Sequence, residues 1–170
     1  IKGKLDNSAT AYGESIKVGN DLNNAGNVQS TGELTVSGNT KNDGKILTES
    51  NFNTKNLENT NEIIAGKNIT TNSIDNKTGA KLSVGESLTA DGNVNNQGMV
   101  KVTDNFNISG DLQNINELAV GGNLDTKAIT NSGSLKTAGK ITGRGVFANS
   151  GEILTSNLDI ETTGVITNTN

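Results

Sequence analysis

The 170-residue sequence contains no cysteine, histidine, proline or tryptophan. Without cysteine, the chain can form neither a disulfide framework nor a thiolate metal site. Without histidine, it lacks the commonest metal ligand and the usual general base of enzymes. These absences remove most enzyme classes, so we expect a protein that is not an enzyme and that uses no cofactor or metal.

Hydrophobic residues are also scarce, at 31% of the chain, and aromatic residues make up only 2%. No apolar run approaches the ~20 residues of a membrane-spanning helix, so membrane insertion is not expected. The net charge is −4, Arg144 is the only arginine, and the lysines are scattered. Nucleic-acid binding requires clustered basic side chains that replace counterions, so no nucleic-acid partner is expected.

What the chain does have is 28 asparagines, 21 glycines and a regular apolar pattern. A polar composition fits disorder, but a disordered chain has no reason to keep its apolar residues in register. Between Asn96 and Gln113 these residues alternate with polar ones, as in a strand with one buried face: Val100, Val102, Phe106, Ile108 and Leu112. Near-copies of this unit fill the chain, which favours a repeat architecture.

One asparagine marks every unit, at intervals of 17 to 20 residues. In stacked coils about 4.7–4.9 Å apart, equivalent amides can hydrogen-bond to one another along the axis. We therefore predict a structural ladder of the following residues: Asn7, Asn24, Asn42, Asn59, Asn76, Asn96, Asn114, Asn131, Asn149 and Asn168.

Two places after most of these asparagines stands a glycine or a second asparagine. This column contains Gly26, Gly44, Asn61, Gly98, Asn116, Gly133 and Gly151. Glycine and asparagine are the residues that enter the left-handed region at low cost. The column predicts a structural turn with positive φ.

Each unit then carries three apolar segments separated by small or polar residues. A first inward pair (Ile63/Ala65, Val100/Val102) is followed by a second (Ile69/Thr71, Phe106/Ile108) and by one closing residue. The closing residues are Leu22, Leu57, Ile74, Val94, Leu112, Ile129 and Val146. So short a unit buries its apolar face only against identical neighbours.

The fold predicted is all-β: a right-handed parallel β-helix of about nine coils of 17–20 residues, with three short strands per coil. Its handedness rests on the general rule for parallel crossovers. The coil 76–96 has surplus residues, which predict a bulge at Lys77–Lys81, and the last coil has extra residues between Ile160 and Val165. Because the pattern already runs at Leu5 and still runs at Asn168, we expect residues 1–170 to be one segment of a longer solenoid.

The unit reads N-x-G-x-hydrophobic-x-hydrophobic, then G-N/D-hydrophobic, as in Asn114 to Thr126. It resembles the repeats of filamentous haemagglutinins, bacterial two-partner-secretion exoproteins that include adhesins and contact-dependent growth-inhibition proteins. The resemblance implies a β-helical shaft, exported by an outer-membrane two-partner-secretion transporter to the medium or the bacterial cell surface. It implies as a possible partner a receptor on a host or neighbouring cell, and it brings no functional residue to this chain.

The leading functional hypothesis is a structural shaft that displays a distal adhesive or effector region. Its rival is that this segment is itself an adhesive face for surface glycan or protein. That face would need an exposed ridge of aromatic or charged residues. The candidates for it are Tyr12, Lys77–Lys81 and Arg144, which are scattered along the sequence.

A weaker alternative is a polysaccharide-acting β-helix enzyme. Such an enzyme needs two carboxylates that converge in one cleft. Glu62, Glu117 and Glu152 share one repeat position but belong to different coils, and Asp104 and Asp111 lie in different turns. We expect these charges to be solvated instead.

Overall fold

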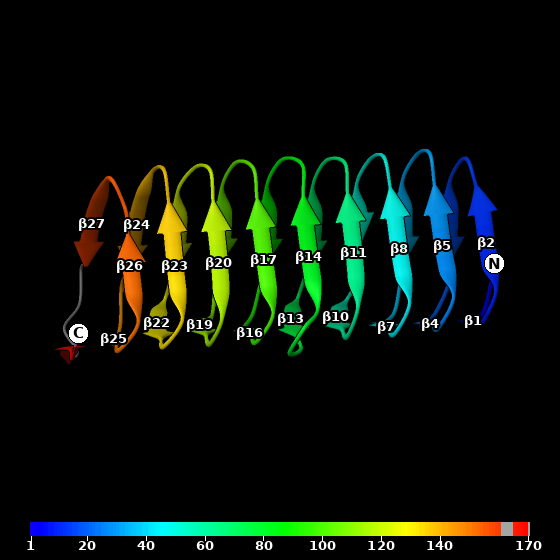
Figure 1. The fold of residues 1–170 in the computed structure, drawn as a ribbon. Helices are drawn as coiled ribbons and strands as arrows, with labels where there is room; N and C mark the ends of the chain where they lie inside the picture. The colour runs from blue at the N-terminus through cyan, green and yellow to red at the C-terminus, as the bar shows by residue number, and fades with distance from the viewer. Residues whose placement is uncertain (161–164, 170) are drawn as a thin grey trace.

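The computed structural model describes residues 1–160 and 165–169, and it is a rod of stacked coils. Figure 1 shows the coils side by side, with the two termini at opposite ends of the rod. Each turn of the chain contributes three short strands, and every strand pair is parallel. The predicted all-β parallel solenoid of about nine coils is therefore confirmed.

The strands form three parallel sheets that run the length of the rod, and each strand pairs with the strand three places along the chain. Sheet A contains β1 (Leu5–Asn7), β4 (Leu22–Asn24), β7 (Thr40–Asn42), β10 (Asn56–Asn59), β13 (Ser73–Asn76), β16 (Val94–Asn96), β19 (Asp111–Asn114), β22 (Ala128–Asn131), β25 (Phe147–Asn149) and β28 (Ile166–Asn168). Sheet B contains β2 (Thr10–Gly13), β5 (Asn27–Ser30), β8 (Lys45–Thr48), β11 (Glu62–Ala65), β14 (Lys81–Val84), β17 (Met99–Val102), β20 (Glu117–Val120), β23 (Ser134–Thr137) and β26 (Glu152–Leu154). Sheet C contains β3 (Ile16–Val18), β6 (Leu34–Val36), β9 (Phe52–Asn53), β12 (Ile69–Thr71), β15 (Leu88–Ala90), β18 (Phe106–Ile108), β21 (Leu124–Thr126), β24 (Lys140–Gly143) and β27 (Asn157–Ile160).

The core is a set of rows in which equivalent side chains stack from coil to coil. In sheet C, Phe52 aligns with Ile69, which aligns with Leu88 and then Phe106, and all four are fully buried. Buried hydroxyls such as those of Thr48 and Thr126 donate to backbone carbonyls at corners of the coil. The predicted inward pairs Ile63/Ala65, Val100/Val102, Ile69/Thr71 and Phe106/Ile108 are all buried and thus confirmed.

One closing residue of a coil was predicted wrongly. Val146 is 50% exposed, whereas Phe147 is buried and aligns with Ile129 of the preceding coil. The corner between β24 and β25 is one residue longer than the corner between β21 and β22, because Thr126 aligns with Gly143 but Ile129 with Phe147. The extra residue pushes Val146 out to solvent.

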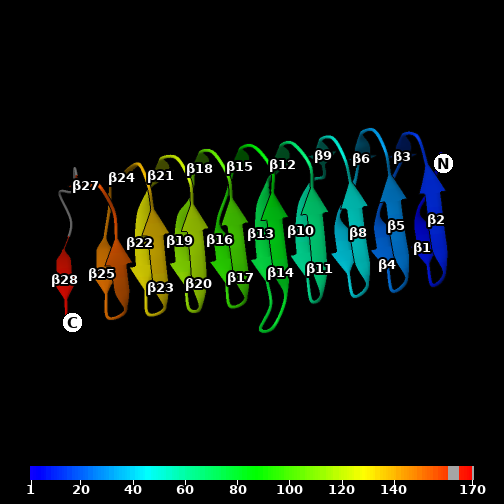
Figure 2. The same ribbon diagram turned by 45° about the horizontal axis from the view of Figure 1, so that its top comes forward.

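The surplus of the coil 76–96 is a turn, as predicted. The chain turns at Thr78–Gly79, where the Ala80 N–H donates to the Lys77 carbonyl (3.0 Å) and Gly79 has φ +80°. Figure 2 shows this connection between β13 and β14 reaching farther from the rod than its neighbours. The extra residues predicted for the last coil, at 161–164, lie outside the described residues.

Candidate functional site

The asparagine column forms an unbroken ladder inside the corner between sheets A and B. Each amide nitrogen Nδ2 donates to the Oδ1 of the next asparagine along the axis, over 2.7–3.0 Å, from Asn7 to Asn168. From Asn24 to Asn131 these side chains are at most 2% exposed. The predicted ladder is therefore present.

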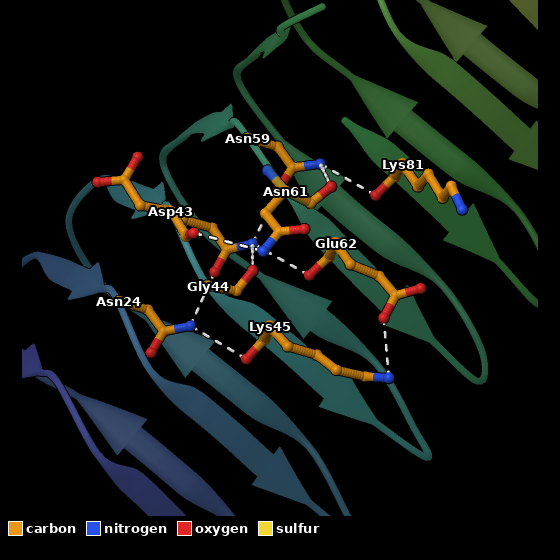
Figure 3. A network of polar contacts seen from close by, with 9 residues as sticks. Asn24, Asp43, Gly44, Lys45, Asn59, Asn61, Glu62 and Lys81 are labelled. Atoms are coloured by element: carbon orange, nitrogen blue, oxygen red, sulfur yellow. Dashed lines mark hydrogen bonds and ion pairs between the residues drawn. The ribbon is translucent and has the colours of Figure 1, made fainter. Parts of the chain in front are cut away.

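The ladder also satisfies backbone carbonyls at the corner of the coil. Asn42 Nδ2 donates to the carbonyls of Gly44 (2.8 Å) and Glu62 (3.0 Å), besides Asn59 Oδ1. Asn24 Nδ2 donates to the equivalent carbonyls of Gly26 (3.0 Å) and Lys45 (3.0 Å), and Figure 3 shows the bond to Lys45. An unpaired buried carbonyl or amide would cost about 1–3 kcal/mol, so this column holds the turn and the stack together.

The turn column bends the chain as expected, but its predicted positive φ is wrong. Among the described residues, Gly79 alone has positive φ, so Gly26, Gly44, Asn61, Gly98, Asn116, Gly133 and Gly151 have negative φ. The reason for glycine is close approach: a Cβ on Gly133 would stand 2.0 Å from the Asn116 carbonyl oxygen of the preceding coil. Asn61 and Asn116 have a side chain in this column, so the space between this position and the preceding coil differs from coil to coil.

A second set of asparagine and aspartate side chains, which the sequence analysis missed, lines the other two corners. Each side-chain Oδ1 accepts from the backbone N–H of the equivalent residue in the next coil, over 2.8–3.2 Å. The acceptors are Asp21, Asn51, Asn68, Asn93, Asn105 and Asn123. The signal was available, because each of these residues directly precedes an inward-facing apolar residue or threonine.

Charged side chains form ion pairs on the rod surface. Lys45 Nζ lies 2.8 Å from Glu62 Oε2, and Arg144 donates to both carboxylate oxygens of Asp125 through its two terminal guanidinium nitrogens. A hydrogen bond from Lys4 lowers the pKa of Asp6. A hydrogen bond to Asp75 likewise raises the pKa of Lys77. Both shifts favour the charged form, whereas general acid–base catalysis at neutral pH needs pKa values moved towards 7.

The structure keeps the acidic candidates apart. Glu62, Glu117 and Glu152 occupy one row of sheet B, but β14 and β17 separate the first two, and β23 separates the last two. Among residues 1–160 and 165–169, no group of three histidine, cysteine, aspartate or glutamate side chains could hold a metal ion. Over the same residues, no helix is long and apolar enough to cross a membrane.

The candidate adhesive residues also lie apart. Tyr12 points outward from β2 at one end of the rod and is 67% exposed. Lys77–Lys81 spans the β13–β14 turn, and Arg144 lies after β24 near the other end. The structure brings none of them together.

Two shallow hollows lie side by side on the outer surface of sheet B. One, of about 520 Å³, is lined by Lys101, Ala119, Lys136 and Leu154, and the other, of about 280 Å³, is lined by Ile64, Ser83 and Lys101. Gly85 and Gly121, at the corner between sheets B and C, also line them.

Comparison of the chain with protein-family models, curated proteins and solved structures finds no match.

Proposed function

We propose that this chain is a non-catalytic structural shaft of a secreted bacterial surface exoprotein, which extends and displays a distal adhesive or effector region. The observation that carries the proposal is the unbroken ladder, with nine asparagine–asparagine bonds in a row. Every coil is joined to the next by the same bonds and the same core rows. In a rod built from interchangeable coils, the number of coils sets the length of the rod.

The composition fits export by a two-partner-secretion transporter, the partner implied by the resemblance to filamentous haemagglutinin repeats. A chain without cysteine cannot cross-link in transit. Because each coil contacts mainly the coils beside it, folding can proceed coil by coil as the chain emerges. In this proposal, the place of action is the bacterial surface or the medium.

The rival adhesive function requires that particular coils carry the binding residues. Tyr12, Lys77–Lys81 and Arg144 lie far apart on the rod, which supports the shaft in preference to an adhesive face. A receptor on a host or neighbouring cell would then be bound by the distal region.

The test compares two deletions that each remove two whole coils. Deleting residues 25–59 joins Asn24 to Thr60, and deleting residues 77–114, which include Lys77–Lys81, joins Asn76 to Ile115; both junctions preserve the repeat register. Each variant is displayed between a membrane anchor and a fluorescent binding tip. Energy transfer to a membrane dye then reports the height of the tip.

For a shaft, both deletions lower the tip by about 10 Å, which is two inter-strand spacings, and both leave attachment by the tip unchanged. Loss of attachment in only one deletion, with its fold intact, would favour the adhesive face. An unchanged tip height in both would contradict the role in setting length.

A further inference from the structure

The outward-pointing side chains of sheet B, here called face B, form two rows along the rod. This sheet lies in front in Figure 1. The first row is Tyr12, Gln29, Leu47, Ile64, Ser83, Lys101, Ala119, Lys136 and Leu154. The second row is Thr10, Asn27, Lys45, Glu62, Lys81, Met99, Glu117, Ser134 and Glu152.

The first row differs between its two halves. Towards the amino-terminal end it carries the large side chains Tyr12, Leu47 and Ile64, which are exposed or half-exposed. Towards the carboxy-terminal end, Ala119 lies at the bottom of the 520 Å³ hollow between Lys101 and Lys136. Leu47 therefore protrudes in one half, Ala119 leaves a hollow in the other, and the two ends of the row carry the exposed apolar side chains Tyr12 and Leu154.

We propose that face B is the contact surface of a two-fold symmetric, antiparallel dimer of this chain. A two-fold axis parallel to the strands at β14 overlays the whole nine-stranded sheet on its copy. It sets Leu47 against Ala119 of the second copy, so that the leucine enters the hollow, and it sets Tyr12 against the 60% exposed Leu154 of the second copy in an apolar contact. Such an interface is self-complementary and closes at two subunits.

Charge supports the same pairing. The axis sets Lys45 opposite Glu117 of the second copy and, by symmetry, Glu117 opposite Lys45 of the second copy. Within the chain Glu117 makes no ion pair with another described residue, whereas Lys45 already lies 2.8 Å from Glu62 of its own chain. In the dimer Lys45 would therefore lie between two carboxylates, Glu62 of its own chain and Glu117 of the second copy. Lys81 meets its own equivalent at the axis, one coil away from Glu62 of the second copy, whose carboxylate offsets that repulsion.

The contact area indicates a weak dimer. Nine strands span about 38 Å along the axis, and four residues span about 13 Å across it, which gives a footprint of roughly 500 Å² per copy. The total of roughly 1,000 Å² lies at the low end of specific interfaces. The dimer should therefore form reversibly and depend on concentration. This inference is independent of the proposed shaft function.

Charge reversal tests the pairing by sedimentation equilibrium of the 17.6 kDa chain from about 5 to 500 µM. Lys45→Glu and Glu117→Lys should each raise the dimer dissociation constant about 10-fold or more, because each places like charges together twice per dimer. The double variant should recover most of the loss. Lys17→Glu, an equal charge change on the outside of sheet C, should leave the dissociation constant unchanged.

Single cysteines give a second readout, since the chain has none of its own. Ser83→Cys, at the axis, should be cross-linked to its copy by a short bismaleimide reagent, because sheets packed about 10 Å apart place the two thiols within its reach but too far apart for a disulfide. Thr89→Cys, on sheet C of the same coil, should cross-link far more slowly. A monomer up to 500 µM would overturn the proposal. So would a dimer insensitive to Lys45→Glu, or equal cross-linking by both cysteines.

Discussion

The contribution of the asparagine ladder to stability can be tested at Asn114, which is fully buried in β19. Its Nδ2 donates to Asn131 Oδ1 (2.7 Å) and to the carbonyls of Ser134 (3.0 Å) and Asn116 (3.3 Å), and its Oδ1 accepts from Asn96 Nδ2 (2.8 Å). Replacing it with leucine keeps the bulk and removes all four bonds. The substitution therefore isolates the polar contribution of one rung.

The cost follows from the groups left behind. Asn96 Nδ2 still donates to the Glu117 carbonyl (2.8 Å), and the Asn116 carbonyl still accepts from the Ser134 N–H (2.7 Å). Asn131 Oδ1 loses its donor, and the Ser134 carbonyl loses its amide partner. At about 1–3 kcal/mol for each orphaned group, the free energy of unfolding should fall by roughly 2–5 kcal/mol. For a chain of this size, the melting temperature should then fall by on the order of 5–15 °C.

The assay is thermal and urea unfolding followed by circular dichroism. The matched control is Gln113→Leu, one residue earlier in the same strand, where the side chain points to solvent. The control should change stability by less than about 0.5 kcal/mol. If Asn114→Leu unfolds at the same temperature as Gln113→Leu, the ladder does not stabilise the stack and this reasoning fails.

Two further pairs of substitutions test the core and the turn. Phe106→Ala should lower the free energy of unfolding by roughly 3–5 kcal/mol, because the ring is fully buried in sheet C, whereas Tyr12→Ala, at a 67% exposed position, should cost far less; equal small losses in urea unfolding would mean that the rows are misassigned. Gly133→Ala should destabilise by displacing the coil beneath, since its Cβ would meet the Asn116 carbonyl oxygen at 2.0 Å. Gly79→Ala, which meets no atom but has φ +80°, should cost only the backbone strain of about 1–2 kcal/mol, and a larger loss there than at Gly133 would contradict the close-approach account.

Much of this fold could be read from the sequence because each coil repeats the same local pattern. Alternation at residues such as Val100 and Val102 marks strands, and one asparagine per unit marks the coil length. Register then follows, since only one alignment stacks the asparagines. The right-handed sense rests on the general rule for crossovers and stays a prediction.

The wrong predictions concern residues whose backbone conformation or side-chain direction depends on the neighbouring coil. A column of glycine and asparagine fits both a left-handed turn and a backbone that another chain approaches closely. The negative φ of Gly133 excludes the left-handed turn, and the 2.0 Å between an added Cβ and the Asn116 carbonyl oxygen shows the close approach. Val146 and Phe147 are both apolar, and the length of one corner determines which of them points inward.

The outer asparagines were missed for another reason. Asn105 and Asn123 are exposed, so their role does not show in any apolar pattern. Their position directly before Phe106 and Leu124 is a local signal that can be sought in other solenoids. The sequence predicted no functional site, because the acidic and basic candidates are spread over different coils.

Small-angle X-ray scattering of the chain, at concentrations low enough to keep it monomeric, tests the central claim most directly. Nine inter-strand spacings give a rod of about 43 Å, and deleting residues 25–59 should shorten it by about 10 Å at constant cross-section. A compact globular profile, or a deletion that changes the cross-section and leaves the length unchanged, would contradict the stacked-coil shaft.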